Sequence, residues 1–181
     1  INTAALQGAY VLDVTSNDGG EELVGTFRLD GNGNVESEVT SGDQTTGFIL
    51  LDGLTYVQNP TDGSWIFYQE GSAAAPTLNV DELALSDDDI NEISNDETIE
   101  ELGEQDCSVG TCLVYRDTDE EEMQVALVKV EKSTGRLVEV EITSTDTDEK
   151  TTVMYSYPDS VEITAPEGAT EFVVPSFDTG Q

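Results

Sequence analysis

The 181-residue chain contains no histidine, which excludes most familiar enzyme mechanisms. Without histidine, the usual general base and the serine or cysteine triads are unavailable. The sequence also has neither a Gly-x-Ser-x-Gly nucleophile turn nor a Gly-Lys-Ser phosphate loop. Carboxylate pairs of the glycosidase kind are inevitable among 39 acidic residues, so no single pair is informative. We therefore expect a protein that is not an enzyme.

Positive charge is nearly absent, because only 6 Lys and Arg stand against 39 Asp and Glu, a net charge of −33. Six scattered cations cannot build the basic patches that nucleic acid requires, and an anionic membrane surface would repel the chain. Two interpretations of the acidity stay open: a solvated surface suited to high salt, or specific cation binding. Self-repulsion of this size favours a monomer.

Long apolar runs are missing too, so no segment of about 18 apolar residues could span a bilayer as a helix. The chain begins at Ile1, almost on a predicted strand and with no visible signal peptide, so we expect that targeting residues or a lipid anchor preceded it.

Cysteine is equally scarce, and its only two copies, Cys107 and Cys112, flank a predicted turn. This spacing favours a disulfide, and with it an oxidising, extracytoplasmic setting; two free thiols are the alternative. Zinc is disfavoured because the other ligands are lacking.

The remaining sequence alternates apolar and polar residues, as half-buried β-strands do. Short polar connections, such as 133–136 and 146–149, can only join antiparallel neighbours. We expect a mainly β (α+β) single domain over 1–181 with about ten or eleven antiparallel strands, four of them in 122–166. A loop and short-helix insert is predicted over about 71–106, with strands resuming at Leu113, and a tail over 167–181 adds an edge strand or lies loose. A sheet of this size curls into a barrel, an open half-barrel or a sandwich.

The turn from Asp30 to Glu36 places oxygen-bearing side chains at alternate positions, as calcium loops do. The candidate ligands are Asp30, Asn32, Asn34 and Glu36. The pattern lacks the glycine at its sixth position, which is Val35, and the glutamate at its twelfth, which is Ser41. A plain hairpin turn is therefore the favoured interpretation, with calcium as the alternative.

Apolar residues of the strands form the candidate binding site. If they converge, the curled sheet encloses an apolar interior that could receive a ligand; the alternative is an ordinary dry core. The predicted ligand-binding residues are Tyr10, Leu12, Phe27, Phe48, Leu50, Tyr56, Trp65, Phe67, Val138, Val140 and Tyr155.

The order of several motifs resembles the LolA/LolB-like lipoprotein carriers and the LppX/LprG-type lipid-binding lipoproteins. The motifs lie at 25–29, 50–57, 64–68, 134–140 and 161–168. This resemblance implies an open antiparallel half-barrel, capped by short helices, that holds acyl chains in the cell envelope without catalysis or cofactor. The basic residue that the lipoprotein carriers show after the second strand is here Gly31, which points toward the lipid-binding relatives.

Three functional hypotheses follow. The first is an exported carrier of a lipid, lipidated peptide or other apolar ligand, with an envelope or surface protein as its partner. The second is a surface or filament-forming domain that assembles through sheet edges, with 172–174 as the donated strand. The third is a calcium-stabilised extracellular module.

Overall fold

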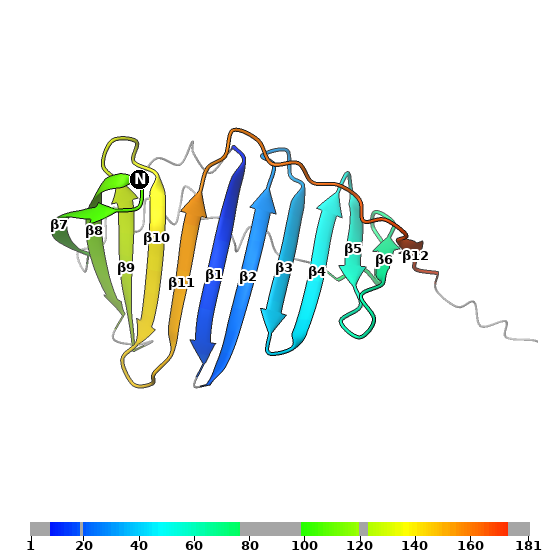
Figure 1. Cartoon of the computed structure of the whole chain (residues 1–181), viewed down its shortest axis with the longest axis horizontal. Helices are drawn as coiled ribbons and strands as arrows, with labels where there is room; N and C mark the ends of the chain where they lie inside the picture. The colour runs from blue at the N-terminus through cyan, green and yellow to red at the C-terminus, as the bar shows by residue number, and fades with distance from the viewer. Residues whose placement is uncertain (1–7, 19, 77–98, 120–122, 174–181) are drawn as a thin grey trace, which may run out of the picture.

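The structure is a computed structural model, and it describes residues 8–18, 20–76, 99–119 and 123–173. All the secondary structure in this part of the chain is β (Figure 1). The strands are β1 (Tyr10–Asp18), β2 (Glu21–Leu29), β3 (Val35–Ser41), β4 (Gln44–Leu51), β5 (Leu54–Gln58), β6 (Trp65–Tyr68), β7 (Glu100–Cys107), β8 (Gly110–Asp119), β9 (Gln124–Glu131), β10 (Leu137–Ser144), β11 (Lys150–Ser156) and β12 (Thr170–Glu171).

The strands form one sheet in the order β12-β6-β5-β4-β3-β2-β1-β11-β10-β9-β8-β7. Two meanders, β1 to β6 and β7 to β11, meet where β1 pairs with β11 in the middle of the sheet. Every pairing is antiparallel except that of β12, which lies parallel to β6. Short turns explain the meanders; the turn between β4 and β5, for example, has positive φ at both Asp52 (50°) and Gly53 (80°), as a tight hairpin requires.

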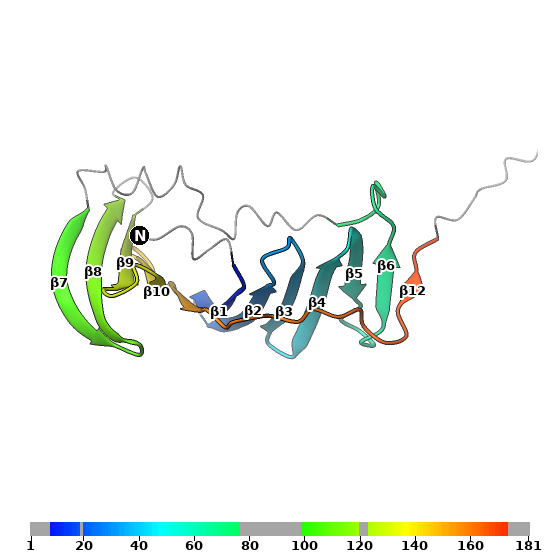
Figure 2. The ribbon, with the colours of Figure 1, turned by 90° about the horizontal axis from the view of Figure 1, so that it is seen from above.

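The sheet is open and curved. Figure 2 shows that it curls in the same direction at both ends, with β7 and β12 as unjoined edges. The predicted open half-barrel of antiparallel strands is therefore confirmed, and the tail supplies the short edge strand β12.

Two boundaries differ from the prediction. Residues 100–107 form β7, although we placed 71–106 in an insert and the next strand at Leu113. The segment of β7 is rich in acids and lacks apolar alternation, so it is a strand because it pairs with β8, not because of its own pattern. The fourth strand expected in 122–166 is also absent: residues 157–169 cross the sheet without strand pairing. The predicted short helices fall in 77–98, outside the described residues.

Candidate functional site: the concave face of the sheet

The strand register divides the side chains of the sheet into two faces. Figure 2 places the segment 157–169 on the outside of the curve, and Ile163 from this segment packs on Ile49 and Tyr56. Side chains on the same side as Ile49 therefore form the convex face, and the alternate positions form the concave face.

The centre of the concave face is an apolar cluster built by directly opposed residues. Leu12 of β1 stands between Phe27 and Tyr155, while Val35 of β3 stands between Leu29 and Leu50. Leu12 is 2% exposed and Val35 is 0% exposed, whereas the Phe27 and Leu50 that pack on this cluster are half-buried. The concave face thus has a buried floor with half-buried apolar side chains around it.

Eight of the predicted ligand-binding residues lie on this face. They are Tyr10, Leu12, Phe27, Phe48, Leu50, Val138, Val140 and Tyr155. Sequence reasoning missed other members of the same face, because it did not fix the register: Leu29, Val35, Val57, Val128 and Val153 share it.

Tyr56, Trp65 and Phe67 lie on the opposite, convex face, so the predicted set does not converge on one interior. Tyr56 is opposed to both Ile49 and Phe67, and all three belong to the cluster that Ile163 covers. Trp65 lies over Gly47, where an added Cβ would come within 2.5 Å of its ring. The reason for the error is that β4 is apolar on both faces, so alternation alone cannot say which face continues into β5 and β6.

Elsewhere on the convex face, ion pairs join neighbouring strands. Arg28 pairs with Glu36 at 2.9 Å, Arg116 with Glu100 at 3.1 Å, Lys129 with Glu139 at 2.8 Å and Lys150 with Glu141 at 2.8 Å, all between neighbouring strands. A fifth cation, Lys132, pairs with Glu104. These bridges place scarce cations among carboxylates that would otherwise repel one another.

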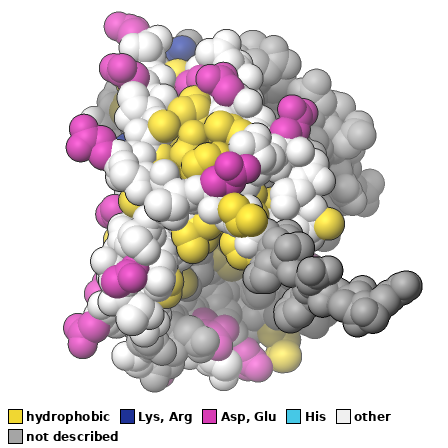
Figure 3. All heavy atoms as spheres, turned by 90° about the vertical axis from the view of Figure 1, so that its right-hand side faces the viewer, with side chains coloured by type: hydrophobic (Ala, Val, Ile, Leu, Met, Phe, Trp, Pro, Cys, Tyr) yellow, Lys and Arg dark blue, Asp and Glu magenta, His cyan; other side chains and the backbone are white. Residues whose placement is uncertain are grey.

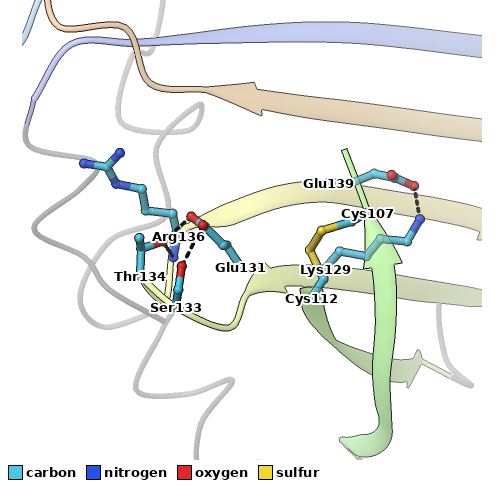
Figure 4. Close-up of a disulfide and its surroundings, with 8 residues drawn as sticks. All are labelled: Cys107, Cys112, Lys129, Glu131, Ser133, Thr134, Arg136 and Glu139. Atoms are coloured by element: carbon cyan, nitrogen blue, oxygen red, sulfur yellow. Dashed lines mark hydrogen bonds and ion pairs between the residues drawn. A yellow bond between two sulfur atoms is a disulfide. The ribbon is translucent and has the colours of Figure 1, made fainter. Parts of the chain in front are cut away.

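Arg136 is the remaining one of the six Lys and Arg residues, and it forms no ion pair with any described carboxylate. The carboxylate of Glu131, its neighbour in the turn, instead accepts hydrogen bonds from Ser133 (2.7 Å) and Thr134 (2.5 Å). Figure 4 shows the Arg136 guanidinium pointing away from Glu131. It lies over the ring of Tyr157, 5.0 Å from the ring centroid, in a cation–π arrangement.

Tyr157 packs against the apolar cluster of the concave face, just beyond the end of β11. Its hydroxyl is buried and is the one buried side-chain polar group in the described chain without a hydrogen-bond partner. No described group accepts the hydroxyl proton of Tyr157.

Burial of the three concave-face tyrosines shapes their ionisation. Desolvation, followed by the nearby Tyr10 hydroxyl, raises the pKa of Tyr155 to about 12. Desolvation also raises the pKa of Tyr10, and desolvation together with Tyr155 raises the pKa of Tyr157 further still. All three therefore remain neutral hydroxyl groups at physiological pH, able to donate a hydrogen bond to a ligand.

The predicted disulfide between Cys107 and Cys112 is present, with the two Cα atoms 5.9 Å apart (Figure 4). It ties the end of β7 to the start of β8 on the convex face, where Cys112 is fully buried. The bond supports an oxidising environment for this protein.

In the predicted calcium turn, the candidate ligands bind one another. The Asp30 carboxylate accepts hydrogen bonds from the backbone N–H and the side-chain amide of both Asn32 and Asn34. The Asn34 side-chain oxygen accepts the Asp52 N–H at 3.0 Å, and Glu36 binds Arg28. Burial alone would raise the pKa of Asp30, but these hydrogen bonds outweigh it and lower the pKa. The turn thus has an internal hydrogen-bond network, while the prediction that calcium binds there stays a prediction.

Two kinds of feature are absent from the described residues. No group of three His, Cys, Asp or Glu side chains among them is placed to hold a metal ion. No helix in these residues has the length and apolarity needed to cross a membrane.

Comparison with known proteins shows the fold. The chain is similar to an uncharacterized conserved protein of Thermus thermophilus, with 9% identity and a TM-score of 0.53, covering 93% of this chain and 92% of that one. It is also similar to the lipoprotein LppX of Mycobacterium tuberculosis, with 11% identity and a TM-score of 0.50, covering 89% and 93%. This chain therefore has an LppX-like open-sheet fold, as the resemblance in its motifs predicted. No protein-family model and no curated protein sequence matches it.

Proposed function

We propose that this protein is a non-enzymatic, extracytoplasmic carrier that holds a lipid, a lipidated peptide or another apolar ligand against the concave face. The observation that supports the proposal is the contrast between the faces: the concave one is apolar across its centre, whereas charges cover the centre of the convex one. Its half-buried apolar side chains, such as Phe48 and Val140, would contact an acyl chain.

The proposal is tested with the neutral apolar dye N-phenyl-1-naphthylamine and with native mass spectrometry of the gently purified protein. We expect a fluorescence increase on dye binding and a co-purified lipid. A matched pair on β10 locates the site, because Val140 lies on the concave face and Thr143 on the convex face.

Val140→Gln should weaken dye binding roughly tenfold, since burying an amide without a partner costs on the order of 1–3 kcal/mol. Thr143→Gln should leave dye binding unchanged. Failure of the wild type to bind dye or lipid would mean that the protein's own side chains fill this face, and the carrier function would be abandoned.

A second candidate function is assembly through the sheet edge at β12. Phe172 and Val173 follow this two-residue strand with 38% and 74% of their surface exposed, and Figure 3 shows an apolar patch bordered by acidic side chains on this side of the molecule. The ring centroid of Phe172 lies 4.9 Å from that of Tyr68 in the same chain. The segment 172–174, which we predicted to be donated to a neighbouring molecule, therefore also contacts its own sheet. Salt should promote such association by screening the net charge. Monomeric light scattering at high protein concentration in molar salt would exclude it.

A further inference from the structure

Two hydrogen-bond donors lie at the end of the concave face where β11 and the β9–β10 turn meet. One is the only cation of the chain without a carboxylate partner among the described residues, Arg136. The other is the buried hydroxyl of Tyr157, whose ring lies under the Arg136 guanidinium. The protein has 39 acidic residues, so the absence of an ion pair between Arg136 and any described carboxylate needs an explanation in the local structure.

The cause lies in the turn itself. Arg136 lowers the pKa of the Glu131 carboxyl through its charge, yet the Glu131 oxygens accept hydrogen bonds from the Ser133 and Thr134 hydroxyls. These hydrogen bonds, from Thr134 first and Ser133 second, lower the pKa of Glu131 and keep it ionised. The hydroxyls of the turn therefore bind the Glu131 carboxylate, and the Arg136 guanidinium points away from it (Figure 4). The guanidinium lies over the ring of Tyr157 instead.

We propose that Arg136 and Tyr157 recognise the anionic head group, a carboxylate or a phosphate, of an apolar ligand whose chain lies on the concave face. This inference rests on the proposed carrier function and specifies its ligand class. Arg136 offers a fixed positive charge and several N–H donors, and Tyr157 offers an O–H donor that lacks an acceptor. The arginine side chain is exposed, so an incoming head group can reach its guanidinium from solvent.

The net charge of −33 opposes this recognition only at long range. The Debye length falls from about 10 Å at 0.1 M salt to about 3 Å at 1 M, so salt screens the repulsion between the protein and an anionic ligand. A contact hydrogen bond between the guanidinium and the head group is screened much less. We therefore expect binding of an anionic ligand to strengthen as salt rises, the reverse of the behaviour of an exposed ion pair.

The experiment measures displacement of N-phenyl-1-naphthylamine from the intact protein by decanoate, decyl phosphate and methyl decanoate at pH 8, in 0.1 M and 1 M salt. The wild type should bind decanoate or decyl phosphate about tenfold or more tightly than the ester, because hydrogen bonds to charged groups are the strong ones. The better of the two anions identifies the head group. Inorganic phosphate alone should displace no dye, since it lacks the chain.

Two variants and two controls locate the effect. Arg136→Gln and Tyr157→Phe should each lose most of the preference for the anion while still binding the dye. Arg28→Gln and Tyr56→Phe change the same residue types on the convex face and should retain the preference. Tyr157→Phe should also keep or raise the melting temperature, because it removes a buried hydroxyl without a partner.

The failures are distinguishable. Dye binding with equal affinity for decanoate, decyl phosphate and methyl decanoate would overturn the head-group inference and leave the carrier function standing. The head-group inference fails in the same way if Arg136→Gln keeps the preference, or if Arg28→Gln loses it equally. Absence of dye binding in the wild type would overturn the carrier function, and the head-group inference with it.

Discussion

The two faces of the sheet use the same strands in different ways. On the concave face, the apolar cluster around Leu12 and Val35 is built from opposed residues of five neighbouring strands. Ser37, which is 5% exposed, lies on the same face. On the convex face, the apolar cluster around Ile49 is confined to β4, β5 and β6, and cross-strand ion pairs occupy the centre.

The difference is relevant to the proposed carrier function, because 157–169 covers part of one face. The apolar end of the convex face is covered by 157–169 of the same chain, through Val161, Ile163 and Ala169. The concave side chains Phe27, Leu50 and Tyr155 are only partly buried. Because an exposed apolar surface is costly in water, an apolar ligand would gain free energy by covering these side chains, as 157–169 covers the convex cluster.

The largest effect is expected from the floor of the concave face. Leu12→Ala removes a side chain that is 2% exposed, and such substitutions cost about 3 kcal/mol of unfolding free energy because a cavity remains. Urea unfolding followed by circular dichroism measures the loss. A cost below about 1 kcal/mol would indicate that this face is a loosely packed surface, and the contrast between the faces would fail.

The next effect is a loss of stability at alkaline pH. The pKa of Tyr155 is raised to about 12 by burial, whereas in the unfolded chain this group titrates near 10. The folded state therefore retains the proton longer, and the stability from this group is full below about pH 10 and is lost between about pH 10 and 12. Linkage predicts a loss on the order of 2–3 kcal/mol.

Tyrosinate absorbance and denaturant unfolding, measured across this pH range, test the expectation. Tyr155→Phe should abolish one late-titrating tyrosine and flatten the pH dependence. An unchanged titration curve in the variant would show that Tyr155 is not buried on the concave face.

These comparisons also show how far the sequence could carry the prediction. Apolar alternation, or a continuous apolar run as in β4 and β6, together with recognisable turns, indicated the strands β1 to β6 and β8 to β11. These patterns missed β7, whose residues are almost all polar or acidic and become a strand only against β8. Long-range pairing supplies such strands, and no local pattern records it.

The site was predicted in part for the same reason. Eight of the eleven residues share the concave face, but Trp65 and its neighbours required the register of β4 with β5, which a strand apolar on both faces leaves undetermined. Arg136 and Tyr157 left one detectable signal: they are a rare cation and an aromatic residue near strand ends. Their proximity depends on β10 pairing with β11, so sequence spacing does not reveal it.

A smaller effect is expected on the convex face. Ile163→Ala should cost about 2 kcal/mol, the lower end for such substitutions, because Ile163 is 9% exposed and lies on a segment without strand pairing. Trp65, the single tryptophan, packs on this cluster, so its emission should shift to the red. Dye binding on the concave face should be unchanged; if it falls as far as it does in Val140→Gln, the two faces are not independent.

The smallest effect is expected at the Asp30 turn, which contributes to neither apolar cluster. Because the turn is already closed by hydrogen bonds from Asn32 and Asn34, EDTA should leave the melting temperature unchanged. Asp30→Asn keeps an acceptor for the backbone N–H groups and should cost about 1 kcal/mol or less. If calcium were bound instead, EDTA would lower the melting temperature of the wild type, and Asp30→Asn would remove that response. Thermal unfolding of both proteins, with and without EDTA, separates a self-contained turn from a metal site.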